Sequence, residues 1–207
     1  MTHKNMTPAL KITYFDITGL AEPARWLLSY GKIDFEDHRI THEEWPALKN
    51  QTPFGQLPLL ECNGKTVSQS VAITRYVAKL VGLTGKNDWE DLEIDSVVDT
   101  INELKLKFQP YGIEKDEEKK QKLKEIFLNE SVPFYLSRLD ERVKNNEGYL
   151  VGGHLTWADV YISSIIFAFK RYLDKDLLED FPTLKKLQEK IIANKNIQDY
   201  LITHPLP

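Results

Sequence analysis

The chain has 207 residues, 42% of them hydrophobic, and carries a net charge of −4 at pH 7. That length can bury a sizeable core in one large or two small domains, and the acidic balance leaves no basic surface for nucleic acid. One cysteine, Cys62, excludes an intramolecular disulfide framework and fits a reducing compartment. The amino terminus is polar, and no apolar run approaches the roughly 18 residues of a membrane span. We therefore expect a soluble cytoplasmic protein without membrane contact.

Strand and helix patterns alternate up to residue 85. Apolar and polar residues alternate over Leu10–Phe15, which is typical of a strand. Gly31 and Gly82 each follow a run of helically spaced apolar residues and are expected to end those helices. Asn63-Gly64 is a strong hairpin-turn signal. This order predicts a mixed four-stranded sheet with helices packed on it. The expected elements are a strand at 10–15, a helix at 21–30, a strand at 35–40, hairpin strands at 57–62 and 65–67, and a helix at 70–81.

All patterns are helical after the linker at residues 82–87. The spacing of apolar residues predicts one long helix from Trp89 to Leu104 and a second from Leu123 to Val143. A third begins at a capping-box variant, Thr156 to Asp159, and a fourth lies around Leu184 to Ile192. We expect two domains, an α/β domain at 8–85 and an all-helical domain at 86–207.

Two neighbouring features suit a small anionic peptide. Pro58 removes one ladder N–H, so a kinked, exposed edge is expected there, with the X-Pro bond held cis and the main chain of Leu57 turned outward. A short extended peptide can hydrogen-bond to such an edge. Gln69-Ser70 opens a helix whose first-turn N–H groups, with Ser70 as the expected cap, can receive a carboxylate. Each feature alone is more often structural, and their adjacency favours a binding site.

These residues carry a family resemblance that spans the chain. The sequence resembles a cytosolic glutathione transferase, and most closely the sigma class of invertebrate enzymes related to glutathione-dependent prostaglandin D synthase. That resemblance implies a thioredoxin-like amino-terminal domain and an all-helical carboxy-terminal domain. It is carried by residues 11–15, 21–25, 30, 35–39, 45–46, 53–58, 69–70 and 155–159.

The resemblance implies a role for each candidate residue. Tyr14 is the catalytic tyrosine, although from the strand pattern alone it would be a packed core aromatic. Its task would be to hydrogen-bond the glutathione thiolate, which is the nucleophile, while itself remaining protonated. The implied glutathione contacts are Trp45 and Lys49 at the glycine carboxylate, Leu57 with Gln56 and Pro58 at the cysteinyl part, and Gln69 and Ser70 at the γ-glutamyl carboxylate.

Two positions depart from the family pattern. Glu103 stands where an aspartate commonly reaches the glutathione amine of a neighbouring subunit, which implies a homodimer; a solvated acidic stripe with Asp95 and Asp99 is the alternative. Leu20 replaces an arginine that supports the catalytic tyrosine in several relatives. We expect activity to survive with a less depressed thiol pKa.

Other chemistries fit less well. The five histidines are scattered, so we expect neither a metal site nor a metal requirement. Cys62 could be a nucleophile in a thioredoxin-like fold, but it ends the hairpin strand far from Tyr14 and is better explained as a small buried hydrophobe. Candidates for the hydrophobic second-substrate pocket are Phe15, Leu20 and Phe108.

The leading functional hypothesis is glutathione conjugation to hydrophobic electrophiles, with peroxidase activity toward lipid hydroperoxides as an extension. Glutathione is then a co-substrate and an apolar electrophile the second partner. Two alternatives stay open: a prostaglandin D synthase-type isomerase, and a crystallin-like structural protein that has lost activity. Because the chain retains the candidate glutathione residues without an evident insertion, catalysis is favoured over the structural role.

Overall fold

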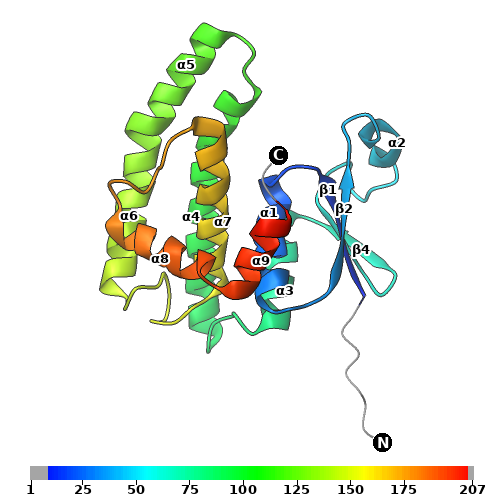
Figure 1. The fold of residues 1–207 in the computed structure, drawn as a ribbon, viewed down its shortest axis with the longest axis horizontal. Coiled ribbons are helices and arrows are strands. Elements are labelled where there is room, and N and C mark those ends of the chain that lie inside the picture. Colours follow the sequence, from blue (N-terminus) through cyan, green and yellow to red (C-terminus); the bar gives the residue numbers. More distant parts are fainter. Residues whose placement is uncertain (1–8, 205–207) are drawn as a thin grey trace, which may run out of the picture. The chain divides into compact units, whose positions relative to one another are not determined.

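The computed structural model describes residues 9–204, apart from the side chain of Arg171 (Figure 1). These residues form two compact units. The first contains the described residues up to Gly82 and those from Ala193 onward, and the second is Leu83–Ile192. The domain limits of 8–85 and 86–207 remain a prediction, but the last helix packs with the first unit rather than the second.

The first unit is built on a mixed four-stranded sheet in the order β2-β1-β3-β4, as the sequence predicts. Strand β1 pairs parallel to β2 and antiparallel to β3, and β3 pairs antiparallel to β4. Its elements are β1 (Leu10–Phe15), the 3-10 turn η1 (Gly19–Ala21), α1 (Glu22–Tyr30), β2 (Phe35–Ile40), α2 (Trp45–Lys49), β3 (Leu59–Cys62), β4 (Lys65–Ser68), α3 (Ser70–Val81) and α9 (Lys195–Thr203).

Helices α1, α3 and the sheet enclose the core of this unit. Ile12 of β1 and Leu60 of β3 are buried from one face of the sheet, while Trp26 and Leu27 of α1 are fully buried. Each such side chain contributes roughly 1.5–3 kcal/mol by leaving water. Helix α1 also packs against α9. The first unit is therefore packed from helices of both the amino-terminal and the carboxy-terminal part of the sequence.

Three details of the first unit differ from expectation. Strand β3 begins at Leu59 rather than residue 57, because Pro58 has no N–H for the ladder; the Leu57-Pro58 bond is cis, as expected. Helix α2 was not predicted, since its five residues are too few to show a helical period. Helix α9 was also missed, because its nine residues have only a narrow apolar face.

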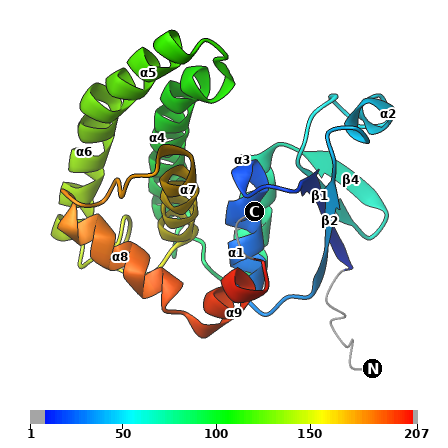
Figure 2. The ribbon, with the colours of Figure 1, turned by 45° about the horizontal axis from the view of Figure 1, so that its top comes forward.

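The second unit is entirely helical (Figure 2). Helix α7 packs against α4 and α8, and α6 packs against α4 and α8. The helices are α4 (Asp88–Ile113), α5 (Glu117–Ile126), α6 (Val132–Asn145), α7 (Trp157–Leu173) and α8 (Pro182–Ile192). Within residues 9–204, no helix combines the length and apolarity needed to cross a bilayer.

The expected second helix is interrupted by a π-helical turn at Phe127–Ser131, which joins α5 to α6. Pro133 in the first turn of α6 cannot donate a backbone hydrogen bond, and a local π turn accommodates such a missing donor. The predicted capping box is confirmed: the Asp159 carboxylate accepts the Thr156 N–H at 2.7 Å, and it also accepts the Leu150 N–H at 2.8 Å.

Candidate active site

The register of β1 and β3 brings the candidate tyrosine to the kinked edge. Thr13 pairs with Leu59 in the antiparallel ladder. Continuing the ladder by one residue sets Pro58 opposite Tyr14. Cys62 pairs with Leu10 at the other end of β1, so the sequence argument that separated it from the tyrosine holds.

The register of the β3–β4 hairpin extends this alignment to the start of α3. Leu59 pairs with Ser68 on β4, so the next step sets Gln69 opposite Pro58. Ser70 then begins α3. The tyrosine, the cis peptide and the amino terminus of α3 therefore meet at one end of the sheet; the adjacency of the motifs predicted this for the last two, and the register adds the tyrosine.

The start of α3 differs from the expected Ser70 cap. Gln69 is the N-cap, with φ 81° and ψ 102°, and no side chain caps the helix. A positive φ is rare for a residue with a Cβ, and such strained backbone gathers at binding sites. Because no cap satisfies the first turn, its N–H groups remain directed out of the helix end. This geometry can bind an anion, although by backbone rather than by a serine cap.

The hydroxyl of Tyr14 is enclosed by the turn that follows β1. The side chain is only 7% exposed, and its oxygen accepts the backbone N–H of Leu20 at 3.2 Å. Gly19 lies against it: a Cβ built there would be 2.7 Å from the hydroxyl oxygen. Gly19 also has φ +48°. It is a site residue that the sequence reasoning missed, and a glycine between a strand and a helix was the available signal.

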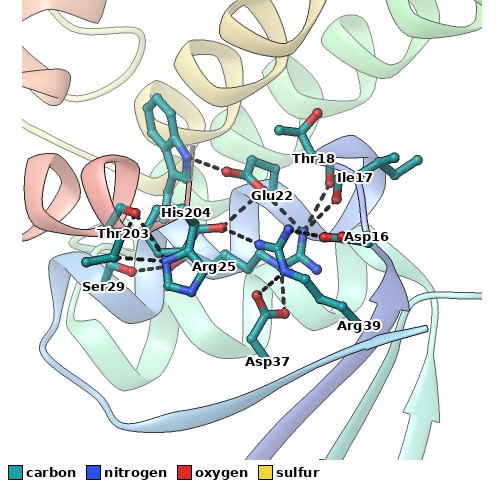
Figure 3. A network of polar contacts seen from close by, with 12 residues as sticks. Asp16, Ile17, Thr18, Glu22, Arg25, Ser29, Asp37, Arg39, Thr203 and His204 are labelled. Carbon is teal, nitrogen blue, oxygen red and sulfur yellow. Dashed lines mark hydrogen bonds and ion pairs between the residues drawn. The ribbon is translucent and has the colours of Figure 1, made fainter. Parts of the chain in front are cut away.

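Arg25 of α1 fixes the backbone of this turn by hydrogen bonds. Its side chain is fully buried, and Nη1 donates to the carbonyl of Ile17 at 2.8 Å and to that of Thr18 at 3.5 Å. Nε donates to Asp37 of β2 at 2.9 Å. Figure 3 shows these contacts converging on the guanidinium. Since two carbonyls of the turn are fixed, the neighbouring Leu20 N–H is positioned for the tyrosine.

A buried acid and a second arginine extend this network. Glu22 is 2% exposed and accepts hydrogen bonds from Trp26 at 2.9 Å and from the Tyr200 hydroxyl of α9 at 3.3 Å. Burial raises the pKa of the Glu22 carboxyl, and the charge of Arg25 opposes that rise. Arg39 of β2 binds Asp37 on the other side, and its pKa is raised by its bonds to carboxylates.

The segment after β2 carries the candidates for the glycine carboxylate. Trp45 begins α2, and its ring lies 5.9 Å from that of Phe15. Lys49 ends α2 and is exposed. A Cβ placed on Gly55 would be 3.4 Å from the Lys49 Cε, so the lysine stem runs beside the loop that leads to Gln56. These contacts place α2 beside the end of β1 and beside the loop at Gly55, within the first unit.

Two predicted residues lie in the second unit. The Glu103 carboxylate accepts the hydroxyl of Tyr135 at 3.2 Å. Phe108 belongs to an aromatic cluster, with ring centroids 4.7 Å from Phe169 and 5.4 Å from Phe127. The other candidates, Phe15 and Leu20 included, lie in the first unit.

Nothing in the described part of the chain, residues 9–204, assembles three or more histidine, cysteine or acidic side chains as metal ligands. Cys62 is half-buried, and its sulfur lies 3.5 Å from the Tyr76 hydroxyl. The contact raises the Tyr76 pKa.

Comparison with known proteins agrees with this arrangement. Residues 10–79 match the glutathione S-transferase N-terminal domain, and residues 102–204 match the glutathione S-transferase C-terminal domain. The chain therefore belongs to the glutathione S-transferase family. Its activity is that of a glutathione transferase, with glutathione as a substrate.

Individual relatives cover nearly the whole chain. A glutathione S-transferase of Anopheles gambiae is 48% identical over 200 residues, which cover 96% of this chain and 98% of the relative. Human hematopoietic prostaglandin D synthase is 36% identical, covering 96% and 98%. The structure of prostaglandin synthase D of Nilaparvata lugens superposes with a TM-score of 0.92 at 44% identity and covers 97% of this chain and 100% of that one. The fold of both units is thus that of solved glutathione transferases.

Proposed function

We propose that Tyr14 activates glutathione by donating a hydrogen bond to its thiolate. A thiol with pKa near 8.5 is only a few per cent ionised at neutral pH. Lowering that pKa by two units takes about 2.7 kcal/mol, which one charge-assisted hydrogen bond nearly supplies. The observation that carries the proposal is the Leu20 N–H on the Tyr14 oxygen, since a hydroxyl that accepts one bond donates the next more strongly.

The rest of the glutathione would be held at the end of the sheet where the strand register aligns Tyr14, Pro58 and Gln69. The main chain of Leu57 pairs with the cysteinyl part, with Gln56 and Pro58 beside it. The uncapped start of α3, at Gln69 and Ser70, receives the γ-glutamyl carboxylate. At the other end of the tripeptide, the glycine carboxylate binds Trp45 and Lys49. Both carboxylates then meet donors, which fixes the thiol in position.

The second substrate in this proposal is a hydrophobic electrophile, for which Phe15 and Leu20 are the candidate contacts in the first unit and Phe108 is the candidate in the second. Conjugation is the main reaction, and reduction of lipid hydroperoxides uses the same thiolate. We assign the chain to the sigma class, supported by 45% identity to glutathione S-transferase S1 of Drosophila melanogaster over 93% of this chain. We further propose a cytoplasmic homodimer in which Glu103 approaches the glutathione of the neighbouring subunit.

A prostaglandin D synthase-type isomerase is the second candidate. It is favoured by the similarity to human hematopoietic prostaglandin D synthase and to the structure of the Nilaparvata lugens enzyme. A crystallin-like role is less well supported, because the candidate glutathione residues are all present.

One assay separates these functions. The purified protein is given glutathione with a panel of aromatic halides, lipid aldehydes, hydroperoxides and prostaglandin H2. Turnover of halides or aldehydes supports conjugation, and a preference for prostaglandin H2 by several orders of magnitude would replace it with the isomerase. No turnover of any substrate would leave only the structural role.

A further inference from the structure

Three polar side chains meet between α4 and α7 of the helical unit. Lys105 Nζ donates to the Asn102 Oδ1 at 2.8 Å and to the Tyr161 Oη at 3.1 Å. The Tyr161 hydroxyl donates to the same Asn102 oxygen at 2.6 Å. Both partners of the lysine are therefore neutral oxygen atoms, and two of its three N–H groups are engaged.

Lys105 forms no ion pair with any residue between 9 and 204, and burial is the cause of its pKa shift. The nearest carboxylate along α4, that of Glu103, is bonded to Tyr135 of α6. Burial lowers the pKa of the Lys105 ammonium to about 8. Tyr161 does not become an anion beside it, because its own burial, together with the Asp99 carboxylate, raises the phenol pKa.

The missing counter-charge changes what the amine can do. With a pKa of about 8, roughly one Lys105 amine in ten is neutral at pH 7, whereas an ordinary lysine is neutral in about one molecule in 3,000. Lys107, two residues on in α4, is exposed and serves as the comparison. The neutral amine is the nucleophilic form, and a desolvated lysine is the usual starting point for attack on a carbonyl.

An aromatic cluster follows this amine along α4, in which Phe108 is half-buried and Phe127 and Phe169 are buried. Phe108 is one helical turn after Lys105 on α4, and it packs on Phe169, which is two turns after Tyr161 on α7. Along the two packed helices α4 and α7, the aromatic pair therefore comes directly after the three polar side chains. A ligand with a polar carbonyl end and an apolar body matches that order.

We propose that Lys105 captures aldehydes with an apolar or aromatic body as a Schiff base. The neutral Nζ attacks the carbonyl carbon, a C–N bond forms, and the carbonyl oxygen takes a proton to give a carbinolamine. The nitrogen lone pair then expels that hydroxyl as water while a C=N bond forms, so one amine and one aldehyde give one imine and one water. The second proton on that water comes from the nitrogen: the Tyr161 hydroxyl, 3.1 Å from Nζ, passes its proton to the departing oxygen and regains one from the nitrogen. The step uses only the helical unit's residues and needs no glutathione.

The test traps the imine by reduction. The full-length protein, without glutathione, is incubated at pH 7 with hexanal and sodium cyanoborohydride, and peptide mapping by mass spectrometry follows the adduct at each lysine. We expect Lys105 to be labelled about tenfold or more faster than Lys107, with a half-maximal rate near pH 8. Hexanal is saturated, so thiol addition to a conjugated double bond does not compete.

Lys105→Arg is the matched variant. It keeps a cation and its hydrogen-bond donors but has no nucleophilic amine, so labelling of that peptide should vanish while the melting temperature stays within a few degrees. Labelling of Lys105 no faster than Lys107, or absent, overturns the proposal. Glutathione conjugation by the same sample is measured separately, and its loss or retention bears on the Tyr14 proposal alone.

Discussion

The guanidinium carbon of Arg25 lies 5.9 Å from the centroid of the Tyr14 ring, and the arginine is completely buried. Arg25 does not bond the tyrosine oxygen. It holds the carbonyls of Ile17 and Thr18, and the turn they belong to delivers the Leu20 N–H to that oxygen. The hydroxyl of Tyr14 is thus supported by a main-chain N–H rather than by the arginine side chain.

Replacing Tyr14 by phenylalanine should leave glutathione affinity nearly unchanged and lower turnover. A charge-assisted hydrogen bond of roughly 1.5–3 kcal/mol corresponds to a loss of about 10- to 150-fold in kcat. Titration of the bound glutathione thiol should show its pKa rising by one to two units, on the order of the same energy. Unchanged turnover would remove Tyr14 as the donor.

Gly19→Ala should displace the Tyr14 hydroxyl, because the new Cβ would lie 2.7 Å from the oxygen, and φ +48° adds backbone strain. We expect a stability loss of about 1–2 kcal/mol and an activity loss of about tenfold or more. Gly64→Ala is the control: its φ is +76°, but nothing lies within 4 Å of its Cβ. If both variants lose stability and activity equally, the close approach has no role of its own.

Leu20→Arg should place a cation near the proposed thiolate and lower the bound thiol pKa by about half a unit to one unit. Leu20→Met keeps the backbone N–H on Tyr14 without the charge, and its thiol pKa should match that of the unsubstituted protein. The measurement is again a titration of glutathione in the complex. The idea fails if arginine and methionine give the same value.

Asp159 should make stability depend on pH. Burial raises its carboxyl pKa from the ordinary value of 3.8 to about 6 in the folded protein. Below about pH 4 both states hold the proton; between about 4 and 6 only the native state does, so unfolding free energy falls as pH rises, by up to about 3 kcal/mol.

The Asp159→Asn variant tests that sign. It lacks the titration, so the stability difference between the unsubstituted protein and the variant should be larger at pH 4.5 than at pH 7. Urea unfolding at both values measures it. A difference that grows with pH would mean that the hydrogen bonds from Leu150 and Thr156 outweigh burial and hold the native pKa low.

Glu103→Gln tests the proposed contribution across a dimer. If the carboxylate approaches the glutathione amine of a neighbouring subunit, KM for glutathione should rise about three- to tenfold with kcat little changed. Sedimentation should show a dimer at assay concentration. A fully active monomer contradicts this role, and the bond to Tyr135 would then be the function of Glu103.

Most of the sheet and the long helices could be predicted, because the spacing of their apolar residues and the residues at their ends indicate them. Gly31 and Gly82 end α1 and α3 as expected, and the Thr156 capping box starts α7. Sequence adjacency also indicated that the cis peptide and the start of α3 lie together. Their alignment with Tyr14 needed the register, which depends on pairing between distant strands.

The parts that could not be predicted depend on contacts across the chain. The role of Gly19 follows from a tyrosine ring that packs over it, and that of Arg25 from carbonyls of a turn. Residue type predicted Ser70 as the helix cap. In the structure Gln69 is the N-cap, and its positive φ makes the turn from β4 into α3. Residue preference gave the wrong cap where tertiary structure determined the conformation.

Helix α9 supplies Tyr200 to Glu22 and the Asn196 side chain to the carbonyl of Tyr30 at 3.1 Å. The first compact unit is thus completed by residues that are made only after the whole second unit. A ribosome-bound chain that has released only the first 82 residues still lacks part of that unit's packing. Its packing during synthesis is completed only when α9 has been made, and proteolytic removal of α9 should loosen α1, against which it packs.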